Sequence, residues 1–202
     1  MPTPGKIDLF KSLKSEYASP RTPKLVPTTP GLYLAFNGSG RPGGDRFGDG
    51  IGALYAVGYT LKFRRKLGPG PDYAVGKLEC IWKHLPAERD SDGWRWQLLM
   101  RVPDFITAAE LDETIAVLIE KKKPATVREV QRVEIDEGLV VQMLHVGPYE
   151  DEPSTFAAMA RYATAEGYAS DGDPHEIYLS DPRRVEPARL KTILRQPVSK
   201  TA

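Results

Sequence analysis

The feature of this 202-residue chain that most constrains its fold is an internal repeat of strand, helix, strand and strand. Apolar residues that alternate or run together predict strands, and apolar residues at three- and four-residue spacing predict helices. The first copy is expected over residues 32–36, 45–67, 73–82 and 94–102, and the second over 139–146, 153–166, 175–179 and 190–197. The shared order favours a duplication.

Short segments of similar sequence lie at matching positions in the two copies. Glu79, within Leu78-Glu79-Cys80-Ile81-Trp82, matches Glu176 within His175-Glu176-Ile177-Tyr178. The run Leu99-Met100-Arg101-Val102-Pro103 matches Ile193-Leu194-Arg195-Gln196-Pro197. Two such units, paired about an approximate two-fold axis, predict one antiparallel-rich sheet with helices on one face. The other face would then form a cleft between the halves, where ligand sites tend to lie, with Glu79 and Glu176 at equivalent positions.

Proline and capping signals divide the chain further. Six prolines within residues 1–30 predict an N-terminal arm with a short helix near 7–17. We expect one domain over 31–198, made of halves at about 31–123 and 124–198. Thr107 and Glu110 form a capping box that begins a helix ending at Lys121. Strands over 127–135 and 139–146 are expected to pair as a hairpin across Asp136-Glu137-Gly138.

Composition argues against several classes of protein. Lys and Arg number 28 against 27 Asp and Glu, so the chain lacks the basic excess typical of nucleic-acid or anionic-membrane binding. The single cysteine, Cys80, has no internal disulfide partner, and neither a signal peptide nor an 18-residue apolar stretch is present. We therefore expect a cytoplasmic protein. A chain of this length can bury a core without a metal or a disulfide, so we also expect a monomer.

Several segments are similar to motifs of the GyrI-like family. The similarity runs from about Lys6 to Val198, in the same order. The segments are Leu54-Tyr55-Ala56-Val57-Gly58-Tyr59-Thr60-Leu61-Lys62-Phe63, Leu78-Glu79-Cys80-Ile81-Trp82, Val102-Pro103-Asp104-Phe105, His145-Val146-Gly147-Pro148-Tyr149 and His175-Glu176-Ile177-Tyr178-Leu179-Ser180-Asp181-Pro182-Arg183-Arg184.

This resemblance implies an α+β fold of duplicated β-α-β-β units, of the SHS2 type, which binds small aromatic or cationic molecules. Members of the family form the drug-sensing domains of multidrug regulators, and another branch inhibits DNA gyrase. The stand-alone subfamily that this chain most resembles includes hydrolases that open the cyclopropane ring of DNA-alkylating natural products inside an aromatic cage. Here Cys80 stands where the family has glycine, and Lys83 replaces its second tryptophan.

Glu176 is the first candidate for a functional carboxylate. Side chains alternate along a strand, so Glu176 and Tyr178 share one face of the strand over 175–179. Glu176 is expected either to balance the charge of a bound cation or to act as a general base. The same two roles are expected of Glu79, because it occupies the equivalent position in the first copy of the repeat. The hydroxyl of Tyr178 is expected to donate to an oxygen that gains charge. The alternative for both glutamates is an ordinary surface charge.

Aromatic side chains next to these motifs are candidates for ligand binding by stacking or cation–π contact. The alternative for each of them is packing in the core. The candidates are Tyr55, Trp82, Phe105, Tyr149 and Tyr178.

No cofactor or metal is expected, because His84, His145 and His175 lack the spacing of metal ligands. The leading hypothesis is a protein that binds and sequesters hydrophobic or cationic aromatic molecules, and it leaves open whether the chain also hydrolyses cyclopropane-bearing xenobiotics. The alternative is a non-catalytic sensor or interaction module, including a role like that of the gyrase inhibitors. The expected partner is a small molecule, with neither nucleic acid nor membrane.

Overall fold

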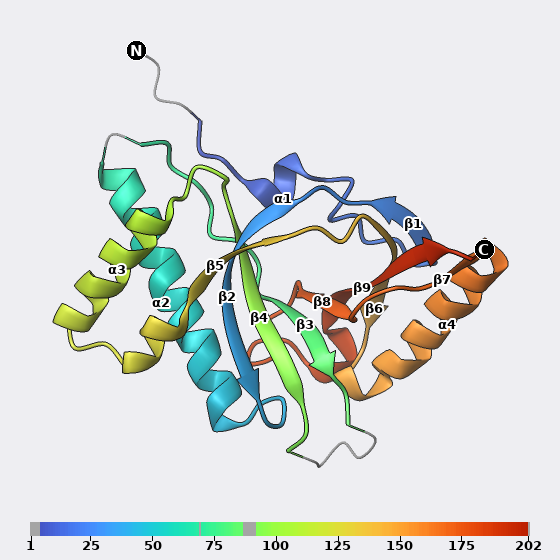
Figure 1. The fold of residues 1–202 in the computed structure, drawn as a ribbon. Coiled ribbons are helices and arrows are strands. Elements are labelled where there is room, and N and C mark those ends of the chain that lie inside the picture. Colours follow the sequence, from blue (N-terminus) through green and yellow to red (C-terminus); the bar gives the residue numbers. More distant parts are fainter. Residues whose placement is uncertain (1–4, 69, 87–91, 202) are drawn as a thin grey trace. The chain divides into compact units, whose positions relative to one another are not determined.

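The structure is a computed structural model that describes residues 5–68, 70–86 and 92–201, so the first four residues of the expected arm lie outside it (Figure 1). Its α-helices are α1 Leu9–Ser12, α2 Asp45–Leu67, α3 Ala108–Glu120 and α4 Glu152–Ala165. Its strands are β1 Lys24–Pro27, β2 Gly31–Ser39, β3 Glu79–His84, β4 Arg95–Val102, β5 Gln131–Ile135, β6 Leu139–Val146, β7 Tyr168–Ser170, β8 His175–Tyr178 and β9 Lys191–Lys200. Short 3-10 helices cover Ala125–Glu129, Tyr149–Asp151 and Pro187–Arg189.

The first of two compact units comprises Met1–Ser12, Gly31–Leu78 and Trp82–Ile135. Its strands are hydrogen-bonded in the order β5-β2-β4-β3, and α2 packs against β2 and β4. Gly50 allows this close packing, because a Cβ there would lie 2.7 Å from the buried ring of Phe36. Leu54, Val57 and Leu61 fill the remaining contact face of the helix.

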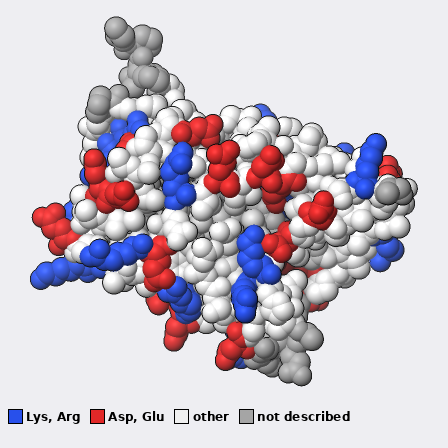
Figure 2. Space-filling view, in the orientation of Figure 1, with Lys and Arg blue, Asp and Glu red and all other residues white. Residues whose placement is uncertain are grey.

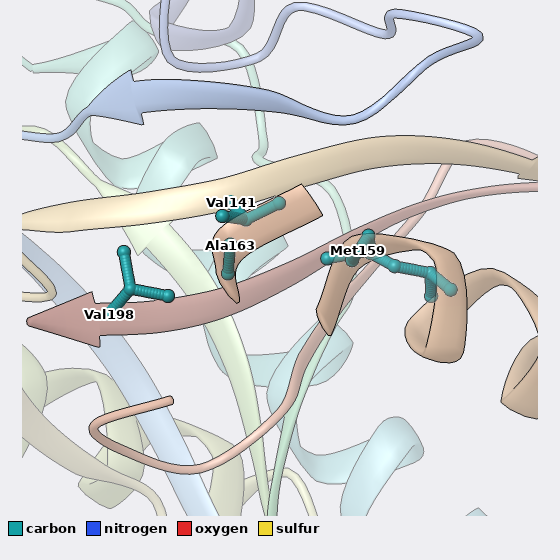
Figure 3. Close-up of a cluster of buried hydrophobic side chains, with 5 residues drawn as sticks. Val141, Met159, Ala163 and Val198 are labelled. Atoms are coloured by element: carbon teal, nitrogen blue, oxygen red, sulfur yellow. The ribbon is translucent and has the colours of Figure 1, made fainter. Parts of the chain in front are cut away.

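The second unit comprises Leu13–Pro30, Glu79–Ile81 and Asp136–Ala202. Its strands follow the order β1-β6-β9-β8-β3, with β7 beside β9, and α4 packs against β6 and β9. A buried apolar cluster holds the helix to these strands (Figure 3). Its members are Val141, Met159, Ala163, Leu194 and Val198.

Each unit contains the same β-α-β-β arrangement. In the first unit β2, α2, β3 and β4 follow one another in the chain, and their strands lie in the order β2-β4-β3. In the second unit β6, α4, β8 and β9 give the order β6-β9-β8. An extra strand joins the outer edge each time, β5 beside β2 and β1 beside β6. The strands pair antiparallel, so the predicted duplicated α+β fold is confirmed.

Helix boundaries agree closely with the sequence patterns. Helix α2 has the predicted bounds, and α3 begins at the predicted capping box. In that box the amide of Glu110 donates to the Thr107 hydroxyl over 3.2 Å, and the amide of Thr107 donates to the Glu110 carboxylate over 2.9 Å. Local signals of this kind need no tertiary information.

The predicted hairpin between residues 127–135 and 139–146 is wrong. Strand β5 pairs with β2, whereas β6 pairs with β1 on one edge and β9 on the other. Both edges of β6 are therefore occupied, and β5 finds its partner elsewhere. The carbonyl of Gly138, a residue with φ of +61°, accepts a hydrogen bond from the amide of Thr28, which precedes β2.

Two further expectations differ in detail. The strand expected over 73–82 begins only at Glu79, and Tyr73 instead makes an isolated bridge with Ile7. Within the expected arm, α1 spans only Leu9–Ser12, and Lys24–Pro27 forms β1 against β6. Proline-rich sequence limits the length of regular structure but does not prevent pairing at a sheet edge.

Candidate functional site

The register between β3 and β8 decides which side chains share a face. Glu176 lies directly opposite Cys80 on β3 and opposite Leu194 on β9. Opposed residues in an antiparallel pair point to the same face. Leu194 belongs to the apolar cluster beneath α4, so Glu176 and Tyr178 lie on the face that α4 covers. We had expected these two residues in a cleft on the face without helices.

Glu176 and Tyr178 are held together on this face. The Tyr178 hydroxyl donates to Glu176 Oε2 over 2.8 Å, and the Glu176 side chain is buried. The ring of Tyr149 meets that of Tyr178 edge to face, with centroids 5.9 Å apart and planes at 85°. Tyr149 begins the 3-10 helix just before α4. Three of the predicted site residues are thus brought together.

A second buried carboxylate, Glu152, lies at the start of α4. Burial raises the pKa of Tyr178 far above its usual range, and the charges of Glu176 and Glu152 raise it further. The pKa of Tyr149 is raised to about 12, mainly by burial and further by the negative charges of Glu152 and Glu176. Both phenols therefore keep their protons at neutral pH and remain hydrogen-bond donors.

Glu152 was not singled out from the sequence. An acidic residue in the first turn of a helix is common, because it complements the positive end of the helix dipole. The only sign of Glu152 in the sequence was its position three residues after Tyr149, the last residue of the family motif that begins at His145. Cys80 shares this environment, and burial and the Glu176 charge raise the pKa of its thiol.

Glu79 lies on the opposite face of the sheet from Glu176. It is paired with Ile177, one position away from the Cys80–Glu176 pair. Its Oε1 accepts a hydrogen bond of 2.9 Å from the Tyr17 hydroxyl, and its Oε2 lies 3.1 Å from Nε2 of His175. The similarity between the two copies aligns Glu79 with Glu176. In the strand pairing, however, the two residues are one position apart, and a shift of one residue moves a side chain to the other face of the sheet. The structure therefore separates Glu79 from Glu176 and Tyr178.

Glu79 belongs to a buried network of alternating charges. His175 Nδ1 lies 2.9 Å from Glu137, and the guanidinium of Arg195 donates to the same carboxylate over 3.2 Å. Arg195 also donates to the side chain of Gln142 and to the carbonyl of Glu16. Two carboxylates are thus balanced by two cations when His175 is protonated.

The pKa values in this network follow from its pairing. Burial alone would lower the pKa of His175, but the carboxylates of Glu137 and Glu79 outweigh it and raise the value to about 9. Burial would likewise raise the pKa of Glu137, but His175 and Arg195 lower it to about 2. Glu137 and His175 are accordingly both charged across the neutral range.

The remaining aromatic candidates belong to the first unit and have different surroundings. Trp82 is buried, stacks on Phe47 at a centroid distance of 6.1 Å and meets Trp94 edge to face at 5.2 Å. Phe105 lies edge to face with Tyr73 and under the guanidinium of Arg65. Tyr55 stacks on Tyr59 along α2. Their roles in ligand binding stay predictions.

A hollow of about 290 Å³ lies in the second unit between α4 and the strands, beside the cluster in Figure 3. Its lining is mostly apolar and includes Phe156, Met159 and Val198, with Ser170 and Gln196 as polar groups. Glu176 and Tyr178 are not among its lining residues. This hollow therefore does not coincide with the candidate site.

Metal binding has no support in the part of the chain that the structure describes, where no group of three or more His, Cys, Asp or Glu side chains is placed to hold an ion. His145 is instead hydrogen-bonded to the Thr155 hydroxyl and the Pro148 carbonyl. Acidic and basic side chains are interspersed over the face shown in Figure 2. Among the described helices, none has the length and apolar character needed to cross a bilayer.

Comparison with known proteins identifies the family. A family model for the GyrI-like small molecule binding domain matches residues 25–199. A conserved protein from Listeria innocua is 37% identical with a TM-score of 0.90, covering 96% of this chain and all of its own. A hydrolase from the same organism is 36% identical with a TM-score of 0.89 and the same coverage.

The C-terminal domain of EcmrR shares the fold at 14% identity and a TM-score of 0.58, covering 89% of this chain and 98% of its own. No curated protein sequence matches. The match over residues 25–199, together with relatives above 35% identity along nearly the whole chain, shows that this chain belongs to the GyrI-like family of small-molecule binding domains.

Proposed function

We propose that the chain binds small hydrophobic or cationic aromatic molecules beside Glu176 and hydrolyses those that carry a strained electrophilic ring. The observation that carries the proposal is the pair of buried carboxylates, Glu176 and Glu152, next to two tyrosines that stay protonated. Buried carboxylates favour a cationic or electron-poor partner. The 36% identity to a hydrolase from Listeria innocua supports the catalytic part.

In the proposed reaction Glu176 is the general base. Tyr178 holds one carboxylate oxygen by its 2.8 Å hydrogen bond, which fixes the orientation of the group. The other oxygen takes a proton from a water molecule, and the water oxygen bonds to a cyclopropane carbon. The ring C–C bond breaks, and its electron pair moves to the oxygen of a conjugated carbonyl. That oxygen then takes up a proton while Glu176 releases the one it took from the water, so the net change is the addition of one water.

Tyr149 is proposed to stabilise the carbonyl oxygen as it gains charge. A phenol with a pKa of about 12 is still protonated at neutral pH and can donate a strong hydrogen bond to an oxyanion. The rings of Tyr149 and Tyr178 would also offer an aromatic surface to a planar ligand.

The test is a mass-spectrometric screen of cyclopropane-bearing alkylating agents and of aromatic cations. Hydrolysis predicts a product heavier by one water, and the Glu176→Gln variant should lower turnover by roughly 10²–10⁴-fold while ligand affinity changes much less. Glu166→Gln is the matched control, because Glu166 is exposed at the other end of α4. Circular dichroism would show that each variant is folded.

A binding protein without catalysis gives a different result. No product would form, and Glu176→Gln would weaken aromatic cations by ~1–3 kcal/mol, as expected for the loss of a charged hydrogen-bond partner, with neutral ligands unaffected. That outcome supports the sensor alternative. Equal and small effects of Glu176→Gln and Glu166→Gln would overturn the assignment of the site.

A further inference from the structure

Helix α2 carries apolar side chains on its solvent side as well as on its buried side. The solvent row repeats every fourth residue, which places its members next to one another along the helix surface. Its central rings stack, with centroid distances of 6.1 Å for the first pair and 6.4 Å for the second. The row, here called the α2 ridge, consists of Ile51, Tyr55, Tyr59, Phe63 and Leu67.

The second half of the α2 ridge is exposed in the folded chain, whereas Ile51 and Tyr55 are half-buried. Tyr59 and Phe63 are each 49% exposed, and Leu67 is 84% exposed. The ridge extends over ~24 Å, at about 1.5 Å per residue. Single exposed apolar residues are ordinary, but a contiguous row of large ones marks an interaction surface.

The space beside the ridge is also open. Gly48 and Gly52 lie on the exposed side of α2, and a Cβ at either position would meet nothing within 4 Å. Glycine inside a helix costs stability relative to alanine, and packing within this chain does not explain it at these two positions. An approaching helix would find room there for its larger side chains.

Charges at the two ends of α2 differ in sign. Asp45 and Asp49 are exposed in its first two turns, whereas Lys66 is exposed in its last turn. The helix dipole has the opposite sense and partly offsets these charges within one copy, but the dipoles of two antiparallel helices also attract each other. A surface with an apolar centre and opposite charges at its ends is complementary to a second copy of itself turned through 180°. A membrane surface would instead favour basic residues along the polar side.

We propose that α2 packs antiparallel against α2 of a second copy of this chain, about a two-fold axis near Tyr59, to form a homodimer. Rows of residues spaced four apart on one helix would lie in the grooves between rows spaced three apart on the other, which crosses the helices at only about 20° and keeps the two ridges in contact along their length. Asp49 of each copy would lie within about one helical turn of Lys66 of the other. The inference is independent of the proposed hydrolysis and differs from the monomer expected from the sequence.

Sedimentation velocity over a range of protein concentrations tests the association. The native chain should approach twice its mass of 22.4 kDa as concentration rises. Phe63→Glu should raise the concentration of half-dimerisation by roughly tenfold or more, the usual effect of losing a large anchor near an interface centre. Leu85→Glu is the matched control, because Leu85 is 48% exposed and lies outside α2. A native chain that stays monomeric throughout overturns the proposal.

Cysteine cross-linking tests the antiparallel geometry without a disruptive substitution. Tyr59→Cys should form a disulfide-linked dimer on mild oxidation, because a two-fold axis brings position 59 next to itself. Leu67→Cys should not link to itself but should link to Ile51→Cys when the two proteins are mixed. The native Cys80 is fully buried and serves as an unreactive background. Self-linkage of Leu67→Cys, or no linkage in any pair, would refute this arrangement.

Discussion

Raising the pH from 6.5 to 9 is expected to take a histidine that is buried between two carboxylates from full to about half protonation. His175 lies 3.1 Å from Glu79 and 2.9 Å from Glu137, and its pKa is raised from 6.5 to about 9. Each pKa unit corresponds to about 1.4 kcal/mol, so protonated His175 stabilises the folded state by ~3 kcal/mol at pH values below 6.5.

The sign of the effect follows from the direction of the shift. Because the folded-state pKa of His175 is the higher one, this stabilisation is complete below pH 6.5 and is lost as the pH rises through about 9. The pKa of Glu137 is lowered from 4.5 to about 2, so its contribution is present above pH 4.5 and is lost as the pH falls toward 2. The interaction between His175 and Glu137 therefore stabilises the folded state most between pH 4.5 and pH 6.5.

Urea denaturation across this pH range measures the effect. The free energy of unfolding should fall by ~2.5–3 kcal/mol between pH 6.5 and 9, and Glu137→Gln should flatten that fall, since it removes the largest contribution that raises the His175 pKa. The imidazole signal of His175, followed by NMR, gives the pKa directly. A free energy of unfolding that does not change between pH 6.5 and 9, or a His175 signal that titrates below 6.5, would refute the reasoning.

Three smaller predictions concern the helices of the first unit, and thermal unfolding at low protein concentration measures each of them. Gly52→Ala should stabilise the fold by ~1 kcal/mol, about 2–4 °C in Tm, because the new methyl meets nothing within 4 Å. Gly50→Ala, two residues away, should destabilise it by up to ~2 kcal/mol, since the methyl would lie 2.7 Å from the ring of Phe36. Thr107→Ala should cost ~1 kcal/mol by removing the acceptor for the Glu110 amide. Equal shifts for the two glycine variants, or no shift for Thr107→Ala, would contradict these assignments.

Elements with local signals were predictable from the sequence. Helix α2 has the predicted bounds, and α3 begins at the capping box of Thr107 and Glu110. Strand β6 also spans the predicted residues, because its apolar run is bounded by glycine at both ends. Propensity, capping and turn chemistry act within a few residues, so one sequence contains all the information they need.

Strand partners and register were less predictable, because they depend on which edges are free. The partner of β5 is β2, since β1 and β9 occupy both edges of β6. Within the candidate site, the association of Glu176 with Tyr178 followed from strand alternation. The opposite orientation of Glu79 could not be predicted in this way. A short sequence similarity between the two copies does not show whether the matched residues are separated by an odd or an even number of positions, and this decides the face of the sheet.

The pairing of Cys80 with Glu176 also limits how this site can change during evolution. Only position 80 of β3 places a side chain directly opposite Glu176, whereas substitutions at Glu79 or Ile81 act on the other face. A single codon therefore controls whether that carboxylate faces a small neutral group, a second acid or a base. Divergence in ligand preference between related chains should be concentrated at this position, while the buried charges behind it stay under selection for stability.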